Sequence, residues 1–418
     1  MTVLILHRNP LEPFPYGRWL HDYDGAVVVL AARDRLAPFG EQVPEGNFGY
    51  RHLEWLDTFD DVAAVRERAL SLANRYEADH VVALHEADLE LAAELRERLG
   101  LPGARPPDVL PFRDKVAMKA RLRAGGIETA LYSVPATAAE ALDFAGRHGF
   151  PLVFKNRSGY NAVGLRILRD QEEFHAYVQS AFRADLVLEA YVPGRMCHVD
   201  GLVAGGRTVM AWPSQYQYDL ASFGTDPGSR VDVALDIDDP LTKRLLELVD
   251  EALEALRAGS QLRNHAFHAE VFQTPDDRLV VCEIAARPAG AKVREVLEAM
   301  FGFNLGEYTI RAELGLPLPA LRESVGGGPR PVPGRMAGQV LMMKRPGLVR
   351  SLPAVPAEEW VERFWLYAVP GQQLPTAGGS ADFLVAAVAS GARRDECERR
   401  LRELGERFER QTDIAAHG

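Results

Sequence analysis

The chain has 418 residues, a formal net charge of −11, three cysteines and 47% hydrophobic residues. Its length predicts two or three domains, and its composition is ordinary for a globular protein. The acidic balance argues against binding to a nucleic-acid backbone, which depends on basic patches. The dispersed cysteines fit a reducing compartment and lack zinc-site spacing. Because no signal-peptide pattern and no apolar run of membrane-spanning length occurs, we expect a cytoplasmic protein.

Residues 1–110 alternate short apolar runs with amphipathic stretches. The runs at 3–6, 26–30 and 80–84 predict buried parallel strands, and the periodicity of 62–76 and 89–99 predicts helices. This alternation indicates an N-terminal α/β domain. A Pro/Gly-rich segment follows the second helix and places the first predicted boundary at residue 110.

The rest of the chain divides at a second Pro/Gly cluster, residues 326–331. Before it, the pattern predicts helices at 114–124, 138–148 and 241–258, and strands at 151–155, 165–168, 186–192 and 198–203. After it, a strand at 336–343 and a charged helix at 393–411 predict a small C-terminal domain.

One stretch, residues 212–230, is predicted to be a long polar and aromatic loop. Long loops inside compact domains are often functional, so this loop is a candidate for substrate contact. The side chains concerned are Gln215, Tyr216, Tyr218, Ser222, Thr225 and Asp226.

Two acidic residues interrupt apolar strands late in the central domain. The runs 268–272 and 279–285 flank a short turn, which predicts a β-hairpin with Glu270 on one strand and Glu283 on the other. Buried carboxylates need a cationic partner, and hard divalent ions such as Mg²⁺ take oxygen ligands. Arg287 adds a planar cation suited to phosphate or carboxylate. The combination indicates phosphoryl-transfer chemistry, with structural ion pairs to Arg or Lys as the alternative.

Lys155 ends a predicted buried strand just before a polar loop that contains Gly159 and Gly164. Backbone N–H groups in such a loop can wrap phosphate oxygens, and the lysine supplies a point charge. No Gly-Lys-Ser/Thr follows the glycines, so the loop is not a Walker motif, and a plain β-turn is the alternative. Lys115 and Lys119, four residues apart on one helical face, favour the phosphate interpretation.

Taken in order, these segments resemble the ATP-grasp superfamily. The resemblance is carried by residues 112–119, 151–155, 158–164, 189–194, 270 and 283–288. No single motif is very specific, whereas the ordered set is. Within the superfamily the chain most resembles the carboxylate–amine ligases, including the L-amino acid ligases that make dipeptides.

The resemblance implies an α/β protein of three parts. Residues 1–110 would form the N-terminal α/β (pre-ATP-grasp) domain. Residues 111–325 would form the ATP-grasp domain, an α+β fold of two subdomains that holds the nucleotide and metal sites. Residues 326–418 would form a small C-terminal α+β domain.

The same resemblance implies where ATP would bind. Lys115 and Lys155 would contact its phosphates and base. The loop that contains Ser158, Gly159 and Gly164 would fold over the triphosphate. Glu189 and the backbone of Tyr191 and Val192 would hold adenine, and His198 or Asp200 would approach the ribose.

It also implies the chemistry. Glu270 and Glu283 would ligate Mg²⁺, for which Mn²⁺ is an alternative, and Arg287 would steady an acyl phosphate or tetrahedral intermediate. Glu283 and Arg287 would therefore be the catalytic residues. ATP would phosphorylate a carboxylate, expected to be that of an amino acid, and an amine would then displace phosphate to form an amide or peptide bond.

The expected partners are small molecules, namely the carboxylate and the amine, with no nucleic acid and no membrane. A homodimer and a role in secondary metabolism are compatible with this resemblance.

Two residues depart from the usual superfamily pattern. Ala285 stands where many members have an Asn metal ligand, and Met196 stands where a Glu often follows the hinge. These departures leave two alternatives open: a ligase for another acceptor, as in purine or cofactor synthesis or the loading of a carrier-protein thiol, and a nucleotide-binding module without turnover. His268 is either a substrate-positioning residue or a satisfied structural histidine.

Overall fold

The computed structural model describes residues 1–415 apart from 38–39, 220–221, 223–225 and 227. Its N-terminal part contains a parallel sheet in the order β3-β2-β1-β4. The strands are β1 Thr2–His7, β2 Ala26–Ala32, β3 His52–Leu56 and β4 His80–Ala83. Helices α2 Val62–Arg75 and α3 Leu89–Leu99 cover one face, and α1 Tyr16–Trp19 lies on the other. Because both faces are covered, the inner strands are continuously apolar, as expected of a parallel sheet.

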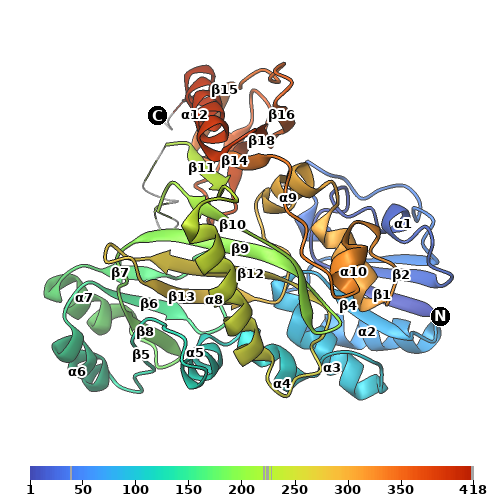
Figure 1. Cartoon of the computed structure of the whole chain (residues 1–418), viewed down its shortest axis with the longest axis horizontal. Coiled ribbons are helices and arrows are strands. Elements are labelled where there is room, and N and C mark those ends of the chain that lie inside the picture. The colour runs from blue at the N-terminus through green and yellow to red at the C-terminus, as the bar shows by residue number, and fades with distance from the viewer. Residues whose placement is uncertain (38–39, 220–221, 223–225, 227, 416–418) are drawn as a thin grey trace.

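A small antiparallel sheet forms the first subdomain of the central region, in the order β5-β8-β6-β7. Its strands are β5 Tyr132–Ser133, β6 Leu152–Asn156, β7 Arg166–Leu168 and β8 Leu186–Ala190. Helices α6 Ala138–His148 and α7 Gln171–Ala181 pack on one face through Phe144 and Phe174, which contact Phe154 and Leu188 in a small core of their own. Figure 1 shows this green unit beside the large sheet.

The large sheet has eight antiparallel strands in the order β13-β12-β9-β10-β11-β14-β18-β16. The strands that the central region of the chain contributes are β9 Arg195–Ala204, β10 Arg207–Tyr216, β11 Arg230–Ala234, β12 His265–Gln273 and β13 Leu279–Ala285. Its C-terminal strands are β14 Met336–Met343, β16 Val361–Leu366 and β18 Phe383–Gly391. The sheet therefore runs without a break across residue 326, and the domain limits stay a prediction.

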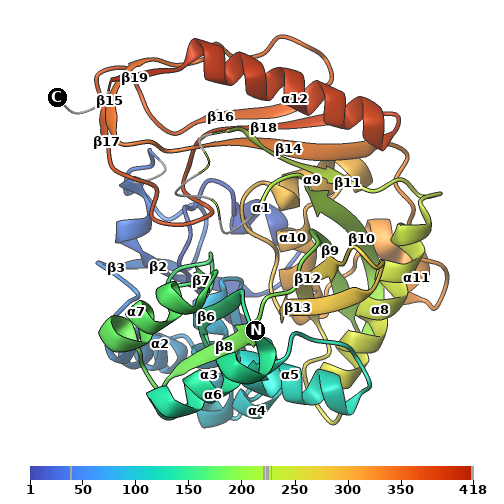
Figure 2. The same ribbon diagram turned by 90° about the vertical axis from the view of Figure 1, so that its left-hand side faces the viewer.

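Helices cover the large sheet along its length. Helices α5 Lys115–Ala124 and α8 Pro240–Arg257 pack on one face, and α9 Val293–Phe301 and α10 Leu305–Glu313 pack on the other. Helix α12 Arg394–Gln411 lies along the C-terminal strands, as Figure 2 shows. The remaining short elements are α4 Pro106–Val109, α11 Arg322–Val325, β15 Gly347–Ser351, β17 Gln373–Leu374 and β19 Asp413–Ala415.

The predicted loop at 212–230 is wrong at both ends. Strand β10 continues to Tyr216, and β11 begins at Arg230. The proline at 213 disguised the strand, because proline donates no ladder hydrogen bond and is unusual inside a sheet. The connection between the two strands is thus shorter than expected, and Thr225 lies outside the described residues.

Within the described residues, no helix combines the length and the apolar character needed to cross a lipid bilayer.

Candidate active site

A cavity of about 580 Å³ opens between the small subdomain and the large sheet. The N-terminal part reaches it through Glu86, and the C-terminal part reaches it through Gln339, Leu341 and Ser380. Most of the predicted site residues line this cavity: Lys115, Lys155, Gly159, Glu189, Tyr191, Val192, Glu270, Glu283 and Arg287. The cavity lining does not include Ser158, Gly164 or His198.

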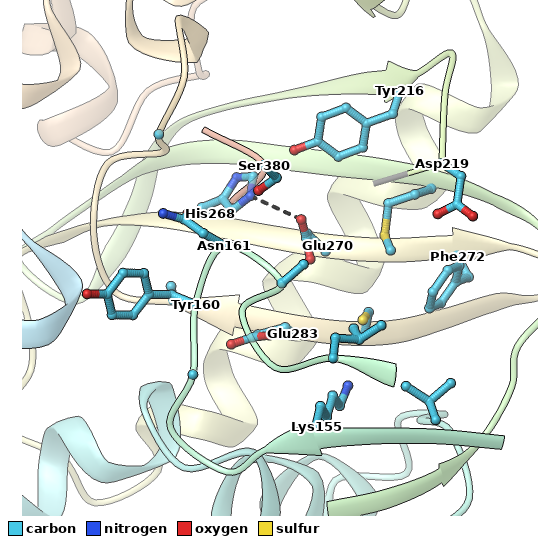
Figure 3. A pocket seen from close by; sticks show the side chains of 18 of the residues that line it. Lys155, Tyr160, Asn161, Tyr216, Asp219, His268, Glu270, Phe272, Glu283 and Ser380 are labelled. Carbon is cyan, nitrogen blue, oxygen red and sulfur yellow. Dashed lines mark ion pairs between the residues drawn. The ribbon is translucent and has the colours of Figure 1, made fainter. Parts of the chain in front are cut away.

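The predicted carboxylate hairpin exists, and its two acids face each other. Glu270 on β12 pairs directly with Glu283 on β13, and the register shifts just after Glu270. Figure 3 shows both side chains entering the cavity from neighbouring strands, above Lys155. Strand pairing alone brings the two carboxylates together, because directly opposed residues lie about 5 Å apart.

Glu283 takes part in an ion pair in this structure. Its Oε1 lies 2.8 Å from Nζ of Lys115, which also donates to the carbonyl of Gly159 at 2.9 Å. This is an ion pair of the kind that the alternative describes, although its partner comes from helix α5 and not from across the sheet. Burial works to raise the pKa of Glu283, but the charges of Lys115 and Lys155 outweigh burial and keep that pKa below the ordinary carboxyl value.

Glu270 contacts a buried polar cluster that contains His268 and Asp200. Nε2 of His268 lies 3.6 Å from Glu270, and its Nδ1 lies 2.9 Å from Asp200. Although burial opposes it, the Asp200 carboxylate raises the pKa of His268 to about 9. His268 is thus a paired histidine whose ring also borders the cavity.

His198 does not reach the cavity. Its two ring nitrogens contact Asp200 at 2.5 Å and Asp232 at 3.0 Å, so both nitrogens must donate and the ring is an imidazolium. Its ring stacks on Tyr216 at 4.6 Å. His198, Asp200 and His268 are close enough together for a metal site. Their hydrogen bonds account for the cluster without a metal.

The donor set at Glu270 and Glu283 does fit a hard divalent cation. Both ligands are carboxylate oxygens, both border the same cavity, and Mg²⁺ typically uses one or two carboxylates together with substrate phosphates. The ammonium of Lys115 already supplies positive charge beside Glu283. Because Ala285 contributes no ligand atom, any further ligands would be water or substrate oxygens.

Lys155 and Lys119 share one buried carboxylate. Glu189 lies 2.9 Å from Nζ of Lys155 and 3.2 Å from Nζ of Lys119, and all three side chains are buried. The Lys119 contact lacks hydrogen-bond geometry, so it is purely ionic. Burial works to raise the pKa of Glu189, but the two ammonium charges hold it below the ordinary carboxyl value. Together the two lysines and Glu189 carry one net positive charge, which lies at the cavity wall.

The chain leaves β8 through a hinge at one end of the cavity. Tyr191 donates its N–H to the carbonyl of Pro151 at 3.1 Å. Gly194 has a φ of +149°, and a Cβ there would lie 2.3 Å from the carbonyl of Gln273, so this position requires glycine. Apolar side chains that line this part of the cavity are Val153, Ile167, Val192, Met196 and Phe272.

Arg287 is held by a carboxylate that the sequence did not single out. Its Nε and Nη2 lie 2.8 Å and 2.7 Å from Oε2 of Glu86. Burial works to lower the pKa of Arg287, but the Glu86 charge outweighs burial and raises it. Glu86 follows strand β4 at the carboxyl edge of a parallel sheet, where ligand sites commonly form, and that position was its only signal.

The predicted phosphate loop contacts both the N-terminal part and the C-terminal part of the protein. Tyr160 meets the ring of His85 edge-on at 5.6 Å, and the carbonyl of Asn161 accepts from the N–H of Ser380 at 3.4 Å. Ser158 offers its carbonyl to Arg113 at 3.2 Å. The loop therefore lies over the cavity, as Figure 3 shows for Tyr160 and Asn161.

Known proteins resemble the chain over most of its length. No protein-family model matches it. It is 24% identical over 321 residues to the L-arginine-specific L-amino acid ligase of Bacillus subtilis, which covers 74% of each chain. It is 28% identical over 218 residues to D-alanine–D-alanine ligase A of Chromobacterium violaceum, which covers 46% of this chain and 58% of that enzyme.

Among solved structures, an L-amino acid ligase from Bacillus licheniformis superposes with a TM-score of 0.79 at 19% identity, over 100% of this chain and 99% of that one. That likeness confirms the predicted three-part α/β architecture and the ATP-grasp fold. The sequence relatives include amino acid ligases, among them an alanine–anticapsin ligase of Bacillus subtilis. The chain thus has the ATP-grasp fold and is similar in sequence to amino acid ligases.

Proposed function

We propose that the cavity binds ATP with Mg²⁺ and activates the carboxylate of an amino acid for attack by the amine of a second amino acid. The proposal is carried by one arrangement. Glu270 and Glu283 face each other in a cavity that also presents Lys115, Lys155 and Arg287. Opposed carboxylates beside fixed cations suit a polyphosphate with a divalent ion.

The residues divide into binding and chemical roles. Lys155 would hold phosphate oxygens, and the backbone of the loop that carries Gly159 would cover them. Lys115 would exchange its contact with Glu283 for a phosphate when ATP binds. The apolar slot beside Tyr191 and Val192 would accept adenine. A bound Mg²⁺ would neutralise charge on the transferring phosphoryl group.

The proposed reaction has two steps. A carboxylate oxygen of the first substrate attacks the γ-phosphorus, the bond to the β-phosphate oxygen breaks, and ADP leaves. The amine of the second substrate then attacks the acyl carbon, phosphate leaves, and the amine loses a proton. Arg287 would stabilise the negative charge of the tetrahedral oxygen, which is the kind of term that dominates such catalysis.

To test the proposed function, phosphate release and amide formation are measured in the same reaction. Purified protein is given ATP, Mg²⁺ and amino acids singly and in pairs, and products are analysed by mass spectrometry. Hydroxylamine in place of the amine should trap the acyl phosphate as a hydroxamate. Phosphate release without hydroxamate or amide across the panel would overturn the proposal.

A matched pair of variants assigns the activity to the hairpin. Glu283→Gln should lower the turnover of amide formation by roughly 10²-fold or more, because it removes one metal carboxylate without changing shape. Asp276→Asn removes an exposed carboxylate from the turn of the same hairpin and should leave turnover unchanged. Equal effects of the two variants would contradict the assignment.

A further inference from the structure

Glu86 is a buried carboxylate that two guanidinium groups share. It begins a short 3₁₀ helix, Glu86–Asp88, shortly after β4, and its side chain is 4% exposed. Oε1 accepts from Nη1 of Arg113 at 2.6 Å, and Oε2 accepts from Nε of Arg287 at 2.8 Å. One residue of the N-terminal part therefore meets two cations from distant parts of the chain.

These contacts fix how Arg287 is presented to the cavity. Nε and Nη2 both face Glu86, and Nη1 donates to the carbonyl of Pro288 at 3.0 Å. A planar guanidinium held on two sides cannot turn freely, so its remaining N–H groups have a set direction. Because Glu86 already accepts on both oxygens, it is suited to hold cations.

The second cation extends the arrangement to the phosphate loop. Nη2 of Arg113 donates to the carbonyl of Ser158 at 3.2 Å, at the start of that loop. Another carboxylate near Arg113 is Glu90, at 3.8 Å from Nε, and it is half-exposed. Glu86 thus contacts Arg287 directly and reaches the phosphate loop through Arg113.

We propose that Glu86 is a positioning residue of the ligation reaction, which acts by holding Arg287 and, through Arg113, the phosphate loop. The inference rests on the proposed function. It makes the N-terminal part a contributor to turnover. If Glu86 only formed a structural ion pair with these arginines, it would stabilise the fold but would not affect the rate of the chemical step.

The chain contains a matched control for that distinction. Asp88 lies two residues on in the same 3₁₀ helix, is 1% exposed, and is gripped by Nε of Arg8 at 3.0 Å. It does not border the cavity. Asp88→Asn therefore removes an equally buried arginine partner from the same element and changes none of the side chains that line the cavity.

The experiment compares Glu86→Gln, Glu86→Asp and Asp88→Asn in the full chain. Turnover of amide formation, the KM for ATP and the melting temperature are measured for each. We expect Glu86→Gln to lower turnover about 10²-fold, the cost of slight misplacement of a catalytic group, while its KM for ATP changes much less. Glu86→Asp keeps the charge, so its turnover should lie between those of the unaltered chain and Glu86→Gln. Asp88→Asn should lower the melting temperature as much as Glu86→Gln does, but its turnover should equal that of the unaltered chain.

A double-variant cycle shows whether Glu86 acts through Arg287. If it does, Arg287→Ala combined with Glu86→Gln should lose clearly less turnover than the product of the two single losses, and what is lost beyond Arg287→Ala alone is the part that acts through Arg113. Multiplied losses, or equal turnover losses in Glu86→Gln and Asp88→Asn, would overturn the inference. If Glu86→Gln does not fold, Glu86→Asp decides, because unchanged turnover there excludes positioning. Failure of the proposed function is distinct, since the unaltered chain would then form no amide.

Discussion

Glu189 is the residue on which two buried lysines depend. Its carboxylate faces Lys119 and Lys155 with water excluded. Removing one partner of a buried ion pair leaves an uncompensated charge, which costs about 3–5 kcal/mol. We expect Glu189→Gln to lower the free energy of unfolding by this amount, as measured by urea denaturation at pH 7. A change below about 1 kcal/mol would show that the lysines find other partners.

The same residue predicts a pH dependence. The folded pKa of Glu189 lies below its unfolded value of about 4.3, so its contribution is present above pH 4.3 and is lost as the pH falls through the folded pKa. The difference in unfolding free energy between the unaltered chain and Glu189→Gln should therefore shrink below about pH 4. Urea denaturation from pH 7 to pH 3 measures it, and a constant difference would contradict the assigned pairing.

Residue identity predicted Lys115, Lys155, Glu189, Glu270, Glu283 and Arg287 as charged residues of the site, but it missed Glu86 and did not predict how these side chains pair. Glu283 was predicted as a metal ligand and is paired with Lys115, which lies 168 residues away in the chain. Glu86 and Arg287 are 201 residues apart. Such contacts depend on how domains pack, and no local pattern encodes them.

Local elements were predicted well wherever their own pattern decided them. Helix α6 and strand β14 have the predicted bounds, because each has a clear period and clear ends. Strand β3 was missed, since His52 and Glu54 interrupt its apolar pattern and every residue in it is half-buried. Strand β10 was misread at its proline, which the sheet tolerates by pairing Pro213 with Val199.

The N-cap residue of helix α5, Asp114, also holds the start of the phosphate loop. Asp114 accepts from the N–H groups of Val116 and Ala117, and its Oδ2 accepts from Arg157 at 2.9 Å. Loss of a helix cap costs about 1 kcal/mol. We therefore expect Asp114→Ala to lower both the free energy of unfolding and the turnover of amide formation.

The cap of helix α7 provides the control for that prediction. Asp170 accepts from the N–H of Glu173 at 2.9 Å and does not border the cavity. Asp170→Ala should cost a similar free energy of unfolding, measured by urea denaturation, while turnover is unchanged. If both variants retain full turnover, the Asp114–Arg157 contact does not matter to the loop.

At the scale of the whole molecule, the large sheet joins the central and C-terminal regions. Strand β11 pairs with β14 from Arg230 to Val233, and Gln339 of β14 donates to Asp232 at 2.9 Å. Gln339 also accepts from the backbone N–H of Lys292 at 2.8 Å, just past the loop that borders the cavity. The C-terminal region therefore supports the wall of the site.

Because the sheet is continuous, the central region should depend on the C-terminal region for its stability. A variant that ends at residue 333 would strip β14 and α12 from β11, exposing Val231 and Val233, which are at most 3% exposed in the full chain. An unpaired edge strand with an apolar face promotes aggregation. We expect this variant to form aggregates in size-exclusion chromatography and to lose strand signal in circular dichroism. A variant that ends at residue 411 removes only the short edge strand β19 and should remain folded. A monomeric, folded 1–333 variant would instead show that residues 326–418 form an independent domain, as the sequence pattern predicted.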